Sequence, residues 1–192
     1  MHPFLNRSLA AAALCIATAC GRHSASMSSS PVASDYSPAI SGAVARLRAA
    51  TDKYHSLDSA VAVGYPAAVP ECLVHAEHGA MGYHHVNRNY VDNKVEIEKP
   101  EILLYERLGD GSYRLNGVEF IVPFRTWPRD SVPPTLMGMK MHREDNLKIW
   151  YTHVWAWTKN PEGLFANFNP EVQCRNGTGK VYAPTIDPSP PA

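Results

Sequence analysis

The chain has 192 residues, and its 18 lysines and arginines balance its 18 aspartates and glutamates, so the formal net charge is zero at pH 7. No basic stripe or block of like charge is present, which argues against nucleic acid or another polyanion as a partner. No segment after residue 19 reaches the roughly 18 apolar residues that a transmembrane helix requires.

The first 19 residues have the composition of a signal peptide. Arg7 precedes an apolar run from Leu9 to Ala19 that is too short to span a bilayer. Small residues before a cysteine are the pattern that a bacterial lipoprotein signal peptidase accepts, which predicts a lipid on Cys20. Ordinary signal-peptidase cleavage after Ala19 is the alternative. Both predict export to the bacterial cell envelope (periplasm or outer membrane), and the first adds a membrane anchor.

The rest of the sequence divides into one domain and two tails. Residues 20–38 are rich in serine and alanine and are expected to form a flexible tether. Residues 183–192 contain four prolines and are expected to be extended. Residues 39–182 suffice for one hydrophobic core. The oligomeric state is not indicated by the sequence.

Two helices are expected at the start of the domain. Ser37 and Pro38 provide an N-cap and a proline at the first helical position, and apolar residues then recur at three- and four-residue steps as far as Tyr54. Ser56 is placed to cap a second, shorter helix, and Gly64 is placed to end it.

Strands are expected to follow the helices. Residues 101–108 and 112–124 flank a Gly-Asp-Gly turn, which indicates a hairpin. Residues 148–158 are rich in aromatic and β-branched side chains and end at a turn over residues 160–163, and residues 81–87 are a fourth candidate strand. The order predicts an α+β fold, with N-terminal helices packed on a mainly antiparallel β-sheet in a single domain.

Two cysteines remain in the expected domain, Cys72 and Cys174. An exported protein meets an oxidising environment, which favours a disulfide between them. The bridge would close a loop of about 100 residues and contribute about 4 kcal/mol in the chain-entropy model. Two separate buried thiols are the alternative.

Histidines are concentrated in one segment. Four of the nine fall within eleven residues: His75, His78, His84 and His85. Their spacing does not match HExxH or another strong metal-binding motif, and Gly79 and Gly82 would break a helix that aligned them. A polar loop with unrelated histidines is the alternative for this cluster taken alone.

Alternation along two strands selects further candidates. In residues 148–158, a period of two places Tyr151, His153, Trp155 and Trp157 on one face. In residues 112–124, the alternating residues 118, 120, 122 and 124 are apolar, and Glu119 points the opposite way. If the strand that carries His84 shares their sheet, then His84, Glu119 and His153 converge.

Two imidazoles and one carboxylate form a facial site for a divalent metal such as Zn, Cu, Mn or Fe. His142 is a fourth candidate ligand, in a methionine-rich setting that also suits copper. The alternatives are a core histidine at position 153, a solvated carboxylate at position 119, and methionines that simply pack a loop.

Several short strings resemble those of a group of exported bacterial proteins that have no assigned activity. They are Met81–His84, Pro100–Glu106, Gly117–Phe120, His153–Trp157 and Asn160–Gly163, followed by Asn169-Pro170 and Cys174. The resemblance spans about residues 49–174. It implies an independent domain and supplies no activity.

Two functions follow from these observations. The first is a lipid-anchored envelope metalloprotein that acts on a small organic molecule, with its metal on His84, Glu119 and His153. The second is a non-catalytic module whose pocket of Tyr151, Trp155 and Trp157 binds a sugar, peptide or apolar ligand. Convergence of the two histidines and the glutamate in one pocket would favour the first.

Overall fold

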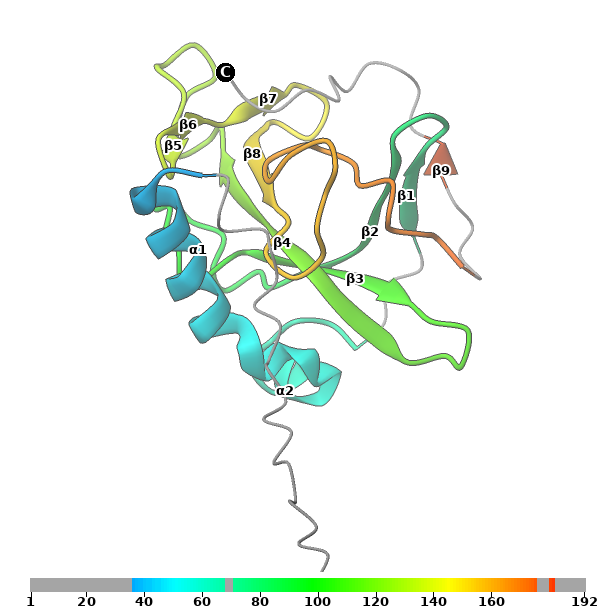
Figure 1. Cartoon of the computed structure of the whole chain (residues 1–192). Coiled ribbons are helices and arrows are strands. Elements are labelled where there is room, and N and C mark those ends of the chain that lie inside the picture. The colour runs from blue at the N-terminus through cyan, green and yellow to red at the C-terminus, as the bar shows by residue number, and fades with distance from the viewer. Residues whose placement is uncertain (1–35, 68–70, 176–179, 182–192) are drawn as a thin grey trace, which may run out of the picture.

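The computed structural model describes residues 36–67, 71–175 and 180–181 (Figure 1). The expected signal peptide, the lipidation site at Cys20 and the proline-rich tail lie outside the described residues. Tyr36, which we expected in the tether, packs on the domain. Its ring centroid lies 6.5 Å from that of Phe165, and its hydroxyl accepts a hydrogen bond from the Leu164 amide at 2.8 Å. Residue 36 therefore belongs to the folded domain.

The N-terminal helices form where their capping residues predict. In α1 (Pro38–Thr51), the Ser37 hydroxyl accepts the Ile40 amide at 3.4 Å. A short 3₁₀ helix, η2 (Asp52–His55), leads to α2 (Leu57–Ala62), where Ser56 caps the Ser59 amide at 3.3 Å. In the part of the chain that the structure describes, no helix has both the length and the apolar character needed to cross a membrane.

The remaining elements are strands: β1 (Cys72–His75), β2 (Gly79–Val86), β3 (Ile102–Arg107), β4 (Tyr113–Pro123), β5 (Thr135–Leu136), β6 (Met139–Lys140), β7 (His142–Glu144), β8 (Ile149–Val154) and β9 (Lys180–Val181). Strands β5 and β6 pair with each other, and the others form one sheet in the order β7-β8-β4-β3-β2-β1-β9. The six strands from β7 to β1 are antiparallel and curl into a half-barrel, and β9 lies parallel to β1 (Figure 1). The predicted α+β fold is confirmed.

The predicted hairpin joins β3 to β4. Its turn is closed by a hydrogen bond from the Gly111 amide to the Leu108 carbonyl at 3.0 Å. The predicted strand over residues 148–158 is shorter than expected. It ends at Val154 because the Trp155 amide donates to the Leu164 carbonyl at 2.9 Å, in the segment that follows β8, and not to β4.

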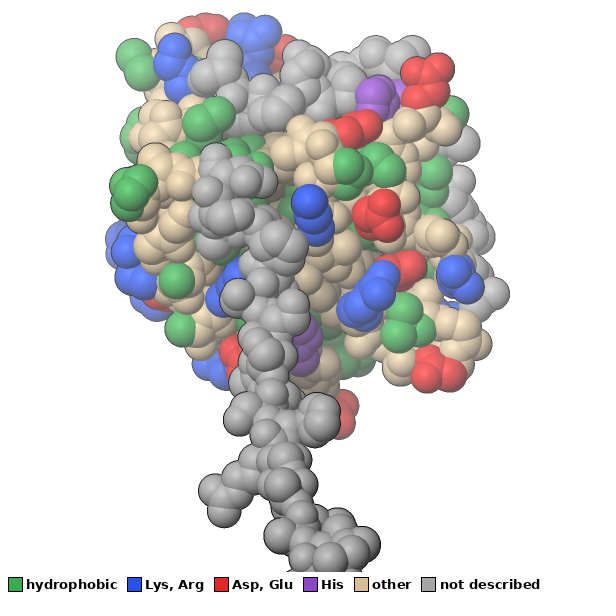
Figure 2. Space-filling model, viewed as in Figure 1, with side chains coloured by type: hydrophobic (Ala, Val, Ile, Leu, Met, Phe, Trp, Pro, Cys, Tyr) green, Lys and Arg blue, Asp and Glu red, His purple; other side chains and the backbone are tan. Residues whose placement is uncertain are grey.

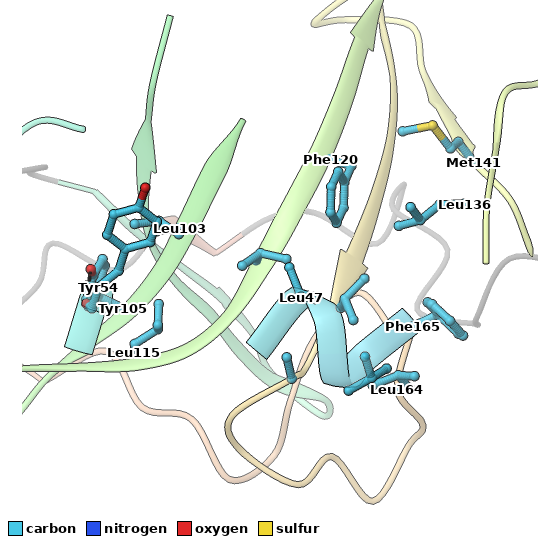
Figure 3. Close-up of a cluster of buried hydrophobic side chains, with 14 of the residues drawn as sticks. Leu47, Tyr54, Leu103, Tyr105, Leu115, Phe120, Leu136, Met141, Leu164 and Phe165 are labelled. Carbon is cyan, nitrogen blue, oxygen red and sulfur yellow. Dashed lines mark hydrogen bonds between the residues drawn. The ribbon is translucent and has the colours of Figure 1, made fainter. Parts of the chain in front are cut away.

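The helices cover one face of the sheet. Leu47 of α1 lies among residues of β3 and β4, including Leu103, Tyr105 and Phe120, and all four side chains are fully buried (Figure 3). A smaller apolar cluster lies on the opposite face and includes Ile102, Ile121, Tyr151, Trp155 and Val172. The sheet therefore has a helix face and a second face, and the second face carries the site described below.

Charges are mixed on the face of the molecule shown in Figure 2. On the side of the molecule shown in Figure 2, basic and acidic side chains are interspersed and neither sign dominates. This distribution agrees with the zero formal net charge of the sequence.

The predicted disulfide is present. Cys72 at the start of β1 is joined to Cys174, 102 residues later, with 5.6 Å between the Cα atoms. The bond connects the sheet to the end of the segment that follows β8. A disulfide of this kind indicates an oxidising, extracytoplasmic location.

Replacing both cysteines with alanine should lower the free energy of unfolding by about 4 kcal/mol, because the denatured chain loses a long covalent loop. Urea denaturation of the oxidised wild type and of the variant measures the difference. Reduced wild type is the control, since it keeps both sulfur atoms in place. A loss below about 1 kcal/mol in both samples would contradict this account.

Candidate metal centre

Three strands bring His84, Glu119 and His153 together on the second face of the sheet. His84 lies on β2, and Glu119 on β4 pairs directly with His153 on β8. One potential ligand atom from each residue lies within 4.8 Å of the other two. The convergence expected from the alternation of the strands is therefore present.

The side chains of His84 and Glu119 lie close to each other although their strands are not neighbours. Strand β3 separates β2 from β4, so residues on those two strands would lie about 10 Å apart in a flat sheet. The distance between His84 Nε2 and Glu119 Oε2 is only 3.4 Å. Side chains from two non-adjacent strands therefore meet above β3 on this face of the sheet.

Gly82 determines which way His84 points. The pairing of β1 with β2 shifts at this point, because Leu73 pairs with Gly82 and Val74 with Ala80, so that Met81 is left over as a bulge. Gly82 has φ of +89°, and a Cβ atom there would lie 2.5 Å from the Tyr105 carbonyl oxygen. Only glycine fits this position. Beyond the bulge, His84 faces the second side of the sheet.

His153 presents an unpaired nitrogen to the site. Its Nδ1 lies 3.1 Å from the amide oxygen of Asn167, which can only accept, so Nδ1 carries the proton. The Nε2 atom then has a free lone pair and lies 3.9 Å from Glu119 Oε2. This Nε2 has no hydrogen-bond partner among the described residues, although the side chain is only 1% exposed. Such an orphaned acceptor is unusual in a protein interior.

Burial keeps the three groups neutral in the absence of a metal. It raises the pKa of Glu119 to about 8, and the charge of Glu101 adds to this effect. Burial lowers the pKa of His84 to about 4, although a backbone hydrogen bond to Gly82 acts in the opposite direction. Burial also lowers the pKa of His153, to about 3. Near pH 7 the histidines are therefore neutral and the glutamate is protonated, so no salt bridge stabilises the cluster.

The three side chains lie in the wall of a pocket of about 430 Å³. Its remaining wall is mainly aliphatic, formed by Leu73, Met81, Val86, Ile102, Ile121 and Ile149. A volume of several hundred Å³ with few polar groups is typical of a site for a small organic molecule.

His142 and Tyr151 lie beside the three-residue group. His142 on β7 pairs with Tyr151 on β8, and the two rings stack with 5.3 Å between their centroids. Tyr151 lines the pocket. His142 is not a member of the group whose ligand atoms lie within 4.8 Å of one another, so the expected fourth ligand does not join the other three.

The expected aromatic face does not form, because β8 ends before the tryptophans. Trp155 is fully buried behind His153, with the two ring planes 12° apart, and its indole nitrogen donates to the Ala166 carbonyl. Trp157 lies on the helix side, where its indole donates to Thr51 of α1 at 3.2 Å. Neither tryptophan is among the residues that line the pocket.

The other clustered histidines lie elsewhere. His85 is buried on the helix side, where its Nδ1 lies 2.7 Å from the Pro66 carbonyl oxygen. His75 and His78 meet at the turn between β1 and β2, and His78 Nδ1 lies 2.7 Å from Glu162 Oε1. Only one histidine of the four therefore belongs to the site.

Sequence reasoning did not identify Asn167, which lies in the irregular segment after β8. Its side-chain amide oxygen accepts a hydrogen bond from His153 Nδ1, and its side-chain amide nitrogen donates one to the Tyr151 hydroxyl at 3.1 Å. A hydrogen bond of this kind fixes the ring orientation and tautomer of a metal-binding histidine. No strand periodicity marks this position, because the segment has no regular structure.

Asn167→Leu should weaken metal binding 10- to 100-fold, on the order of effects at comparable supporting residues. Asn167→Asp keeps an acceptor for His153 Nδ1 and should retain most of the affinity. Competition with a chromophoric chelator measures both. Asn160→Ala is the control, because Asn160 binds the Phe168 carbonyl in the same segment without touching His153. Equal affinities for Asn167→Leu and wild type would refute the positioning role.

No protein-family model, curated protein or solved structure matches this chain. The inference to function therefore depends on the geometry of the site.

Proposed function

We propose that this chain is an exported, lipid-anchored envelope metalloprotein that binds a divalent metal ion on His84, Glu119 and His153 and acts on a small organic molecule in the adjoining pocket. The observation that carries the proposal is the His153 Nε2 atom. It is buried without a hydrogen-bond partner among the described residues and faces a carboxylate and a second imidazole. A metal ion would satisfy all three groups at once.

Hydrogen bonding within the cluster does not explain the arrangement. His153 Nε2 lies 3.9 Å from Glu119 Oε2, beyond the range of a hydrogen bond. His84 Nε2 lies 3.4 Å from Glu119 Oε2, at the outer limit of that range. Ligands held about 2.1 Å from a tetrahedral metal ion lie about 3.4 Å from one another. The distances of 3.4 Å and 3.9 Å from Glu119 Oε2 to the two imidazole nitrogens are close to this value.

The ligand types limit the choice of metal. Two imidazoles and a carboxylate suit Zn, Mn or Fe(II), and a copper ion would be coordinated mainly by the imidazoles. The two cysteines of the described domain form the disulfide and provide no thiolate. Three protein ligands leave open positions, where the metal would lower the pKa of a bound water or polarise a carbonyl. The pocket provides room for the molecule that would react.

Export is supported by the disulfide and by the signal sequence. The lipid on Cys20 depends on the sequence pattern before that residue. The alternative function, a binding module with an aromatic surface, has less support. Of its three proposed aromatic residues, only Tyr151 lines the pocket.

Elemental mass spectrometry tests the proposal. The chain should be exported to the periplasm, purified without a histidine affinity tag, and analysed for bound metals. We expect close to one Zn, Mn, Fe or Cu ion per chain. A variant with His75→Ala and His78→Ala is the matched control, because both histidines lie outside the pocket. Protein that contains no metal and takes up none on dialysis would contradict the proposal.

A further inference from the structure

The aliphatic wall of the pocket extends across five neighbouring strands. Each of β8, β4, β3, β2 and β1 contributes one or two of its six residues, which line the same pocket as the proposed metal centre. Three of the six side chains are buried and three are half-buried. A ligand in the pocket therefore contacts apolar surface across most of the width of the sheet.

Leu147 continues this wall to the surface. An exposed leucine carries no meaning by itself, but Leu147 lines the pocket although the residue is 64% exposed. It lies in the turn between β7 and β8, where Glu144 Oε1 accepts the Asn146 amide at 2.7 Å. The pocket therefore offers apolar contacts from the buried part of its wall to its opening.

The pocket provides one buried position for a polar group of the ligand. Among the described residues that line it, His153 Nε2 is the buried side-chain polar atom without a hydrogen-bond partner. The Tyr151 hydroxyl accepts a hydrogen bond from Asn167 at 3.1 Å. The other polar residues of the lining outside the proposed metal centre are exposed or half-buried: Glu71, Glu144 and Asn146. A matching ligand therefore has one polar end and an apolar remainder.

We infer that the pocket binds an unbranched aliphatic molecule with one oxygen-bearing, metal-coordinating group, such as an acyl compound. The inference rests on the proposed metal centre, since the coordinating group occupies an open position on the metal ion. The alkyl chain lies along the aliphatic wall and passes Leu147 at the opening. An aromatic ring fits this lining less well, because Tyr151, the aromatic carbocycle of the described lining, already stacks against His142 with 5.3 Å between the centroids.

Four hydroxamates that differ only in chain length test the inference: aceto-, butano-, hexano- and octanohydroxamate. Each has the same head group, which binds zinc through two oxygen atoms. Titration calorimetry on the zinc-loaded chain should give dissociation constants that fall by about 15-fold for each two methylenes that the wall buries, since one buried methylene changes affinity about fourfold. Elemental analysis after each titration checks that zinc stays bound.

The metal-free chain separates the two ends of the ligand. Without zinc, the head group loses its coordination, so every dissociation constant should rise. The ratio between the constants for butano- and octanohydroxamate should stay nearly the same, because this ratio depends on the wall and not on the metal.

Leu147→Ser tests the contact at the opening. The dissociation constant of octanohydroxamate should rise about fourfold, the equivalent of one buried methylene, and that of acetohydroxamate should not change, because only the longer chain reaches this residue. Val132→Ser is the matched control, since Val132 is 78% exposed and does not line the pocket. It should leave all four dissociation constants unchanged.

The outcomes separate this inference from the proposed function. Equal binding of all four hydroxamates to a zinc-loaded chain, binding of none of them, or equal effects of Leu147→Ser and Val132→Ser would overturn the inference and leave the metal centre in place. A chain that takes up no metal would overturn the proposed function and, with it, the coordinating end of this inference. The series on the metal-free chain would then still decide whether the wall binds an alkyl chain.

Discussion

Glu119→Gln should abolish stoichiometric metal binding while leaving the metal-free fold intact. Glutamine has the shape of glutamate but supplies a neutral amide in place of an anionic ligand. Loss of a direct ligand should exceed the 10- to 100-fold effect of a supporting residue, so we expect the metal dissociation constant to rise more than 100-fold. Glu119 is protonated near pH 7 in the metal-free protein, and the amide is a close match for that neutral form.

The matched control is Glu101→Gln. Glu101 is also a buried carboxyl group with a pKa raised by burial to about 8, and its Oε2 accepts the Ile121 amide at 3.1 Å. It does not line the pocket. Elemental analysis and chelator competition should show wild-type metal content for Glu101→Gln and almost none for Glu119→Gln. Full metal content in both would show that the carboxylate is not a ligand.

Glu119 is a cleaner target for substitution than His153. The His153 ring packs on Trp155 and donates a hydrogen bond to the Asn167 amide oxygen. Removing the ring would leave a cavity and an amide oxygen without this hydrogen bond. A loss of metal in His153→Ala would therefore combine ligand loss with destabilisation. The glutamine variant separates these effects. Its circular dichroism at pH 7 should match that of the metal-free wild type, and urea denaturation should show no loss of stability, because glutamine releases no proton on unfolding.

Much of the fold follows from local patterns in the sequence. Caps at Ser37 and Ser56, the Gly-Asp-Gly turn and the alternation of β4 each have a local physical cause that is visible in the sequence. The same alternation places Glu119 opposite the helix-facing residues, and the β4–β8 pairing then places it beside His153. The proximity of Glu119 and His153 was predictable to this extent.

Other features depend on contacts between distant segments. Alternation alone extends β8 to Trp157, but the strand ends at Val154 because Trp155 pairs with Leu164 in a later loop. The bulge at Met81, next to Gly82, reverses the face of the residues that follow it, and the sequence shows only a glycine beside it. Asn167 lies in an irregular segment, where no period indicates the direction of a side chain. These details require the tertiary structure.

The stability of the metal-free protein should fall as the pH rises from 7 to 8. Glu101 and Glu119 have folded-state pKa values of about 8, above the ordinary value of 4.5, so the folded state holds two protons that the unfolded state has released. Stability therefore decreases with pH in this range. His84 and His153, with pKa values lowered to about 4 and 3, act in the opposite direction, but mainly below their ordinary value of 6.5.

The net loss should be about 2 kcal/mol between pH 7 and pH 8, since each pKa unit corresponds to about 1.4 kcal/mol for each group. Urea denaturation at several pH values measures the loss. Glu101→Gln and Glu119→Gln should each reduce it by about half, because each removes one of the two carboxyl groups.

Metal binding should halve the same pH dependence in the wild type. A bound divalent ion requires an ionised Glu119, so its proton leaves when the metal binds and no longer distinguishes the folded from the unfolded state. Saturating metal should have no such effect on Glu119→Gln, which has no proton to release at this position. In Glu101→Gln, which keeps the ligand, metal should remove most of the remaining dependence. An equal effect of metal on the slopes of all three proteins would mean that the ion binds elsewhere.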